Sequence, residues 1–212
     1  LLLAAARRLG EGDRLVRAGE WQGAAPRQLL GQPVGGRTLG IVGMGAIGGA
    51  VARRARGFSM PVVYFNRHRA PEAVERELDA RYVPLDELLA TADYVSLHAP
   101  LNDESRHVID AAALARMKPT AVLVNTARGP LVDEAALVRA LQEGRIAAAG
   151  LDVYEREPAL VDGLAQLDNV VMSPHIGSAT TDTRAAMVRL CVDNVVEVLA
   201  GRPALTPAPT PS

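Results

Sequence analysis

Three closely spaced glycines, Gly43, Gly45 and Gly48, follow a short apolar run and precede a helical pattern. In such a turn the first glycine permits a tight bend, the second lets the backbone approach a pyrophosphate, and the third lets helix and strand pack closely. A helix is expected to open through Gly49 to Gly57, and Ala46 and Ile47 lie in the turn at its N-terminus, where free N–H groups attract phosphate. The pattern predicts a dinucleotide site; the alternative is a helix entry that only packs closely.

The next apolar run ends at Asn66, and Arg67, His68 and Arg69 follow it. A carboxylate is expected here when the ribose carries a free 2′-hydroxyl, and this turn has none. Arginine suits a 2′-phosphate through charge-assisted hydrogen bonds. We therefore predict that Asn66, Arg67 and Arg69 favour NADP(H), with NAD(H) as the alternative. The other interpretation is a solvated basic turn in which Arg69 points to water.

Further polar stretches follow the later apolar runs: His98 to Leu101, Asn125 to Gly129, Leu151 to Pro158 and Ser173 to Gly177. In open α/β sheets, the chemistry lies just beyond the carboxyl ends of the strands. An isolated Arg, Glu or His in a loop is more often a surface residue than a catalyst. The four stretches together are more specific than any one of them.

Together these stretches resemble the D-isomer-specific 2-hydroxyacid dehydrogenases over nearly the whole chain. The turn at Asn66 and Arg67 is most similar to the NADPH-preferring glyoxylate/hydroxypyruvate reductase branch. The resemblance implies that Arg128 is the catalytic arginine, Glu157 the catalytic glutamate and His175 the acid/base histidine.

The resemblance also places the acceptor for the nicotinamide carboxamide at Asp152. Pro100, beside His98, falls at the family's adenine-side wall, although His98 itself and His107 suit structural roles. The full set of further cofactor contacts that we expect is His98, Pro100, Thr126, Ala127, His175 and Gly177. We expect no metal site.

The chemistry of a 2-oxo acid reduction explains these residue types. A hydride added to the carbonyl carbon builds negative charge on its oxygen, so the site needs a proton donor and a fixed cation. His175 is suited to supply the proton because imidazole is the side chain that can gain and lose one near neutral pH, and Glu157 would favour the protonated ring and orient it. The forked, permanently charged Arg128 would hold the carboxylate or polarise the carbonyl.

The elements that must position these residues are short apolar runs separated by helical patterns. Such alternation predicts a doubly wound parallel sheet of the Rossmann-like α/β class. Asp110 and Asp133 are suited to cap helices over 111–117 and 134–142, and one leading helix is expected over 1–18. The six predicted strands are 39–42, 62–65, 94–97, 121–125, 146–151 and 170–173.

We expect one dinucleotide-binding domain over 1–202. It comprises a leading helix and connection (1–35), a core (36–178) and a closing helix (179–202), which we expect to stop at Gly201. A proline-rich tail over 203–212, with Pro203, Pro207, Pro209 and Pro211, is expected to be disordered.

Composition limits the function classes. The 212 residues carry 23 basic and 24 acidic side chains, a net charge of -1 that argues against nucleic acid as a partner. A single cysteine, Cys191, excludes a disulfide framework and suits a cytoplasmic protein. No apolar run reaches the roughly 18 residues of a membrane span, so we expect no membrane partner.

The chain also departs from the family pattern. Members carry a separate substrate-binding domain before this region, which is largely absent here, and the sequence starts without Met inside a helical pattern. We expect a piece of a longer enzyme that binds cofactor but turns over poorly. By resemblance, the first helix and the residues up to Pro33 contribute to a homodimer. Alternative functions are a dinucleotide-gated, corepressor-like module and the same chemistry on a bulkier 2-oxo acid.

Overall fold

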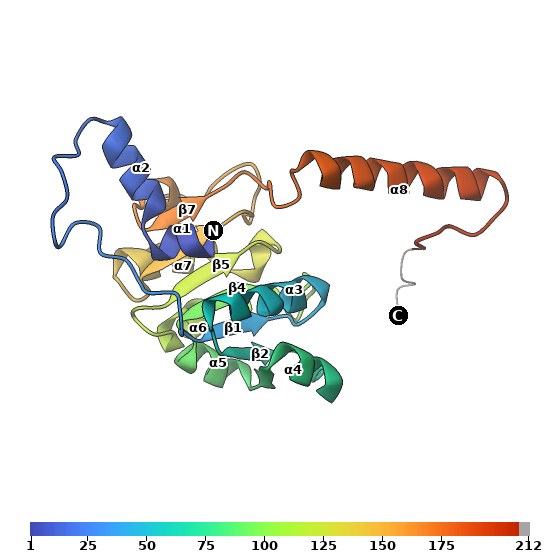
Figure 1. The fold of residues 1–212 in the computed structure, drawn as a ribbon, viewed down its shortest axis with the longest axis horizontal. Helices are drawn as coiled ribbons and strands as arrows, with labels where there is room; N and C mark the ends of the chain where they lie inside the picture. Colours follow the sequence, from blue (N-terminus) through green and yellow to red (C-terminus); the bar gives the residue numbers. More distant parts are fainter. Residues whose placement is uncertain (208–212) are drawn as a thin grey trace. The chain divides into compact units, whose positions relative to one another are not determined.

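The computed structural model describes residues 1–207, and the tail residues 208–212, with Pro209 and Pro211, lie outside the described residues. Within this range seven parallel strands form one sheet in the order β3-β2-β1-β4-β5-β6-β7 (Figure 1). The strands are β1 Leu39–Val42, β2 Val62–Phe65, β3 Ala80–Tyr82, β4 Tyr94–Leu97, β5 Val122–Asn125, β6 Ala148–Leu151 and β7 Val170–Met172. The chain winds one way from β1 and the other way from β4, which confirms the doubly wound α/β prediction.

Helices cover both faces of this sheet, as a parallel sheet requires (Figure 1). In residues 1–174 the helices are α1 Leu2–Ala6, α2 Leu9–Arg17, α3 Ala46–Ala55, α4 Glu72–Leu78, α5 Leu85–Thr91, α6 Ala111–Arg116 and α7 Glu134–Gln142, and a further helix, α8 Thr181–Leu199, follows in the C-terminal part of the chain. Successive strand residues point to opposite faces, so Ile41 and Val42 belong to two separate apolar clusters. Both clusters are built mostly from Ala, Val and Leu.

Two predicted helix starts are confirmed by their capping hydrogen bonds. The Asp110 carboxylate accepts from the Ala113 N–H at 2.7 Å, and the Asp133 carboxylate accepts from the Ala136 N–H at 2.9 Å. These side chains satisfy backbone donors that the first helical turn leaves without a partner.

The prediction of one leading helix over 1–18 is wrong. The chain breaks between α1 and α2 at Arg8, whose φ of 53° is left-handed. A continuous helix would use the Ala6 carbonyl for an internal hydrogen bond, but the Gln32 N–H takes that carbonyl at 2.7 Å. A returning segment has therefore replaced the local bond.

The sequence analysis also missed β3. This strand has only three residues, Ala80, Arg81 and Tyr82, and lies at the edge of the sheet. It carries no apolar run because only its first residue is buried. The other strands lie where the apolar runs predicted them, with ends that differ by at most two residues.

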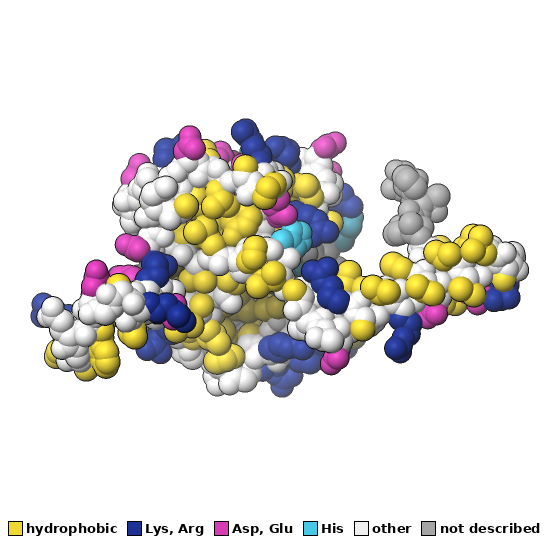
Figure 2. All heavy atoms as spheres, turned by 90° about the horizontal axis from the view of Figure 1, so that it is seen from above, with side chains coloured by type: hydrophobic (Ala, Val, Ile, Leu, Met, Phe, Trp, Pro, Cys, Tyr) yellow, Lys and Arg dark blue, Asp and Glu magenta, His cyan; other side chains and the backbone are white. Residues whose placement is uncertain are grey.

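The contacts divide the chain into two units, Leu1–Pro174 and His175–Ser212. The second unit contains α8, which ends before Gly201 as predicted, and Figure 2 shows hydrophobic side chains along its length. That residues 179–202 close the cofactor domain remains a prediction. In the described part of the chain, no helix is long and apolar enough to span a membrane.

Gly40 in β1 tests how tightly this sheet is packed. A Cβ at Gly40 would lie 2.6 Å from Leu88 Cδ2 and 2.9 Å from Ala92 Cβ, whereas one at Gly49 in α3 would meet Leu78 at an ordinary 3.6 Å. We expect Gly40→Ala to lower the free energy of unfolding by about 1–3 kcal/mol through overpacking. Gly49→Ala, the matched control, should raise it by about 0.5–1 kcal/mol through helix propensity. Urea denaturation measures both, and a Gly40→Ala variant as stable as the parent would contradict the packing argument.

Candidate active site

A cavity of about 450 Å³ lies at the carboxyl ends of β2, β1 and β4. The sheet order reverses between β1 and β4, and this switch point is where open α/β sheets bind ligands. Six of the predicted cofactor residues line this cavity: Gly43, Gly45, Asn66, Arg67, His98 and Pro100.

The glycine turn forms the floor of this cavity. Gly43 has a φ of 102°, and a Cβ there would lie 2.4 Å from the Ala99 nitrogen. A Cβ at Gly48 would lie 2.2 Å from the Gly43 carbonyl oxygen, so the turn and α3 pack directly on each other. A Cβ at Gly45 would meet nothing within 4 Å. Gly45 therefore leaves open space for a ligand at the N-terminus of α3, which begins with Ala46 and Ile47.

Asn66 holds the glycine turn in place. Its side-chain oxygen accepts a 2.6 Å hydrogen bond from the Met44 N–H, across 22 residues of sequence. The turn after β2 is thereby fixed to the turn after β1. Arg67 and His68, the next residues along, line the same cavity.

Arg69 lies outside the lining of this cavity. Its guanidinium donates to both oxygens of Glu75 at 2.8 Å and lies 6.0 Å from the centre of the Tyr82 ring. Tyr64 donates to the same carboxylate at 2.6 Å. These hydrogen bonds from Arg69 and Tyr64 lower the pKa of Glu75 to about 2. The position of Arg69 gives no support to its predicted cofactor role.

His98 contributes a neutral side chain to the cavity. Burial lowers the pKa of this imidazole to about 4, because the charged form loses its hydration. One ring nitrogen lies 2.9 Å from the Ser96 hydroxyl. An uncharged His98 and Pro100 suit a wall against a flat aromatic ring such as adenine.

Arg128 follows β5 in a turn that Asn125 organises. The buried Asn125 amide donates to the Arg128 carbonyl at 2.9 Å and accepts from the Ala127 N–H at 3.1 Å. The Arg128 side chain is exposed, and its guanidinium donates to the Ala127 carbonyl at 2.6 Å. The turn fixes the backbone of Thr126 and Ala127 and leaves the Arg128 guanidinium at the surface.

The turn of Arg128 packs directly on the segment that carries Glu157. A Cβ at Gly129 would lie 1.9 Å from the carbonyl carbon of Tyr154, so only glycine fits between the two backbones. The Glu157 carboxylate accepts from the Tyr154 N–H at 3.0 Å. Arg128 and Glu157 are thus carried by two loops that contact each other.

A network of acidic side chains and a histidine supports the second of these loops. Glu134, at the first position of α7, accepts from the Glu155 N–H at 2.8 Å, and the Glu155 carboxylate lies 2.7 Å from the His107 ring. Burial raises the pKa of Glu134. Sequence reasoning gave His107 a structural role, in agreement with this contact, but missed Glu134 and Glu155. They lie on separate elements, and no local spacing links them.

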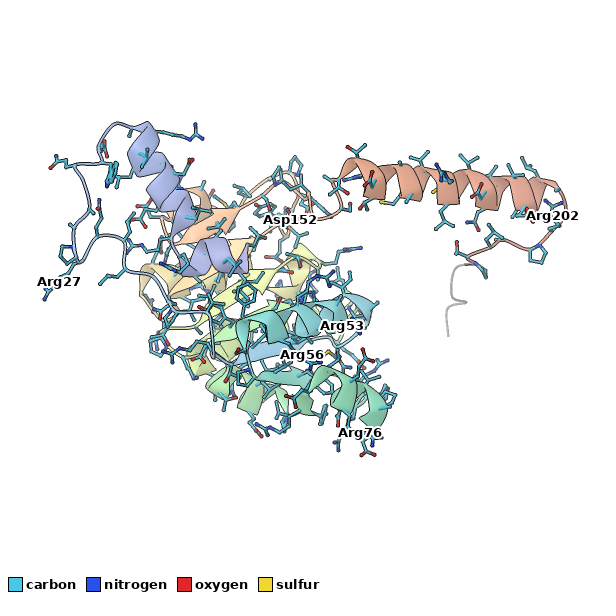
Figure 3. All side chains as sticks on the ribbon, in the orientation of Figure 1. Arg27, Arg53, Arg56, Arg76, Asp152 and Arg202 are labelled. Atoms are coloured by element: carbon cyan, nitrogen blue, oxygen red, sulfur yellow. The ribbon has the colours of Figure 1, made fainter. Side chains whose placement is uncertain are left out.

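Asp152 is buried at the end of β6 (Figure 3), where its carboxylate accepts a 2.5 Å hydrogen bond from the Ser173 hydroxyl. The Tyr154 hydroxyl donates to the Ser173 carbonyl at 2.9 Å. The ends of β6 and β7 are therefore joined by side chains. The local sequence around Ser173 predicts no role for its hydroxyl, because the partner Asp152 lies 21 residues away.

His175 and Gly177 belong to the second unit, outside the elements that carry the other predicted residues. His175 has a φ of 54°, an uncommon backbone conformation for a residue with a side chain. Such conformations often occur at functional sites. In residues 1–207 no group of three or more metal-ligating side chains is found.

The comparisons with known proteins agree with this geometry. The family model described as "D-isomer specific 2-hydroxyacid dehydrogenase, NAD binding domain" matches residues 1–177. This chain belongs to that family. The fold and the glycine turn are those of its dinucleotide-binding domain, and the open space at Gly45 fits a nicotinamide dinucleotide.

Several named relatives of the family are similar over most of this chain. It is 56% identical over 200 residues to a glyoxylate reductase of Thermococcus onnurineus, covering 92% of this chain and 60% of the relative. It is 53% identical over 203 residues to a glyoxylate reductase of Korarchaeum cryptofilum, covering 95% and 61%. The chain thus spans about three fifths of the length of these relatives.

A solved relative was crystallised with a cofactor. The NADPH-dependent glyoxylate/hydroxypyruvate reductase of Sinorhizobium meliloti, in complex with NADP and malonate, is 38% identical with a TM-score of 0.89. The alignment covers 98% of this chain and 64% of that one. The seven-stranded Rossmann-like domain of the family is therefore shared with an NADP-binding structure.

A substitution at Gly45 tests whether the glycine turn binds the dinucleotide or only stabilises the fold. Because a Cβ at Gly45 would meet nothing within 4 Å, we expect Gly45→Val to change the thermal midpoint no more than its control does while lowering dinucleotide affinity by about tenfold or more. Gly57→Val is the matched control, since a Cβ at Gly57 also meets nothing within 4 Å but Gly57 does not line the cavity. Calorimetric titration with NADPH and NADH measures the effect. If Gly45→Val binds both cofactors as tightly as the parent chain does, the pyrophosphate does not bind at this turn.

Proposed function

We propose that this chain is the cofactor-binding and catalytic half of an NADP(H)-dependent 2-hydroxyacid dehydrogenase that reduces glyoxylate or hydroxypyruvate. The observation that carries the proposal is the cavity at the switch point, where the glycine turn lies beside Asn66 and Arg67. Arg128 lies beyond β5, at the same edge of the sheet. The names of the relatives support the substrate class.

Residues of the cavity and of the neighbouring loops would bind different parts of the dinucleotide. The N–H groups at the start of α3, with Ala46 and Ile47, would bind the pyrophosphate. His98 and Pro100 would lie against the adenine, and Arg67 would pair with the 2′-phosphate. Asp152, held by Ser173, would accept from the carboxamide, with Thr126 and Ala127 nearby.

The proposed catalytic roles follow from charge. When bound, the nicotinamide dinucleotide supplies the hydride that reduces the carbonyl carbon. Arg128 would hold the substrate carboxylate through two parallel hydrogen bonds, which lysine cannot form. His175 would donate the proton that the carbonyl oxygen gains, and Glu157 would orient the imidazole ring. The roles of His175, Glu157 and Gly177 rest on the family motif.

We also propose that the enzyme is a homodimer. Exposed apolar side chains on and after the first helices support this proposal; they include Leu9, Val16, Trp21 and Leu30.

Arg67 tests the cofactor preference. We expect the chain to bind NADPH more tightly than NADH, and Arg67→Ala to weaken NADPH binding by about tenfold through loss of a charge-assisted hydrogen bond. NADH binding should change by less than about twofold, since NADH carries no 2′-phosphate that could pair with Arg67. Arg81→Ala is the control, because Arg81 is also an exposed, ion-paired arginine but lies outside the cavity. Equal losses for both cofactors would show that the 2′-phosphate is held elsewhere.

Arg128 and His175 test the catalytic assignment. A chimera in which this chain replaces the matching part of the Thermococcus onnurineus glyoxylate reductase provides a polypeptide of the relative's length. We expect Arg128→Gln or His175→Ala to lower kcat/KM for glyoxylate by about a hundredfold or more, while the NADPH Kd changes by less than about threefold. Arg139→Gln, a distant arginine on α7, is the control. A parallel loss of NADPH binding would refute the assigned roles.

A further inference from the structure

Arg67 forms an ion pair with a residue that lies outside its own turn and also lines the cavity. Its Nη1 lies 2.9 Å from Oε2 of Glu104, a residue 37 positions later in the loop after β4. Both side chains line the cavity, together with the glycine turn of β1, the strand that lies between β2 and β4. The structure thus supplies a carboxylate to a turn that has none in its own sequence.

The loop that carries Glu104 is fixed on both sides of this residue. The Ser105 hydroxyl donates to the Pro100 carbonyl at 2.7 Å, and the Ser105 N–H donates to the Asn102 side chain at 2.9 Å. The Asn102 N–H donates back to the Ser105 hydroxyl at 2.8 Å. Glu104 is therefore held beside Arg67 by the backbone of its own loop.

The ion pair is exposed to solvent, where a phosphate could replace the Glu104 carboxylate on Arg67. The side chains of Arg67 and Glu104 are 67% and 69% exposed, and pairs that are so exposed are weak. A phosphate binds arginine through stronger, charge-assisted hydrogen bonds, so it would displace the carboxylate. The displaced carboxylate would stay near the phosphate and repel it.

We infer that Glu104 is a specificity-determining residue, which competes with the 2′-phosphate of the cofactor for Arg67. The inference rests on the proposed function, since it assigns the phosphate to Arg67. A cofactor with a free 2′-hydroxyl leaves the pair of Arg67 and Glu104 intact, whereas a 2′-phosphorylated cofactor must break it. Glu104 therefore limits the preference for NADP(H) and keeps NAD(H) as a usable ligand.

Calorimetric titration of the chain with NADPH and with NADH tests this role through the ratio of the two Kd values. We expect Glu104→Gln to tighten NADPH binding by about threefold to tenfold, because an ion-pair competitor and a like charge are removed. NADH binding should change by less than about twofold. In an Arg67→Gln background the effect of Glu104→Gln on NADPH should be smaller, because the guanidinium for which Glu104 competes is gone.

Glu87→Gln is the matched control. Glu87 forms a 2.9 Å pair with Arg81, so the control removes one carboxylate from an arginine pair of equal length outside the cavity. Circular dichroism checks that each variant is folded. A fall in the ratio of the NADPH Kd to the NADH Kd for Glu104→Gln but not for Glu87→Gln, at low ionic strength, supports the inference, and a rise in that ratio contradicts it.

The other outcomes overturn the inference in distinguishable ways. If Glu104→Gln leaves the ratio unchanged, tightens both cofactors equally, or matches Glu87→Gln, Glu104 does not set specificity while the proposed function stands. If the folded parent chain binds neither NADPH nor NADH, the proposed function fails, and the inference fails with it.

Discussion

A parallel sheet that is buried on both faces restricts the whole molecule. Its backbone hydrogen bonds are satisfied between strands, and most of its side chains are apolar on both sides, as Ile41 and Val42 are on β1. Polar chemistry is therefore confined to the loops at the strand ends. Because all strands run in the same direction, their carboxyl ends lie at one edge. The cavity, Arg128 and Asp152 follow β1, β2, β4, β5 and β6 at that edge.

Close backbone contact, rather than side-chain packing, fixes the loops at this edge. Gly43 and Gly48 allow the phosphate turn to lie against its neighbours, and Gly129 allows the Arg128 turn to lie against Tyr154. Around these contacts, buried polar groups are paired: Glu134 with the Glu155 backbone and Asp152 with Ser173. The result is a preorganised backbone that carries exposed arginines such as Arg67 and Arg128, which lowers the ordering needed when a ligand binds.

Cofactor preference depends on the charged side chains that different loops bring to this edge of the sheet. The local sequence around Asn66 is basic and lacks an acid, so by itself it favours a 2′-phosphate. In the folded chain Asn66 instead fastens the glycine turn, Arg69 is occupied by Glu75, and Arg67 is paired with Glu104. Of the two arginines in this turn, only Arg67 lines the cavity.

Six of the seven strands, the glycine turn and two helix caps were predictable from the amino-acid sequence. These features depend on neighbours in the chain, through alternation of apolar residues, glycine geometry and the capping side chains of Asp110 and Asp133. The sequence also indicated the family, since the polar stretches recur at the ends of successive strands. The missed β3 and the single leading helix show the limit, because an edge strand and a broken helix depend on partners elsewhere in the chain.

Which charged side chains pair with each other depends on the folded chain. The pairs of Arg67 with Glu104 and of Glu155 with His107 join residues 37 and 48 positions apart. No local periodicity encodes such contacts, because they arise when parallel strands bring distant loops to a common edge. The sequence therefore specified the types of groups at the site, and the fold determined their partners.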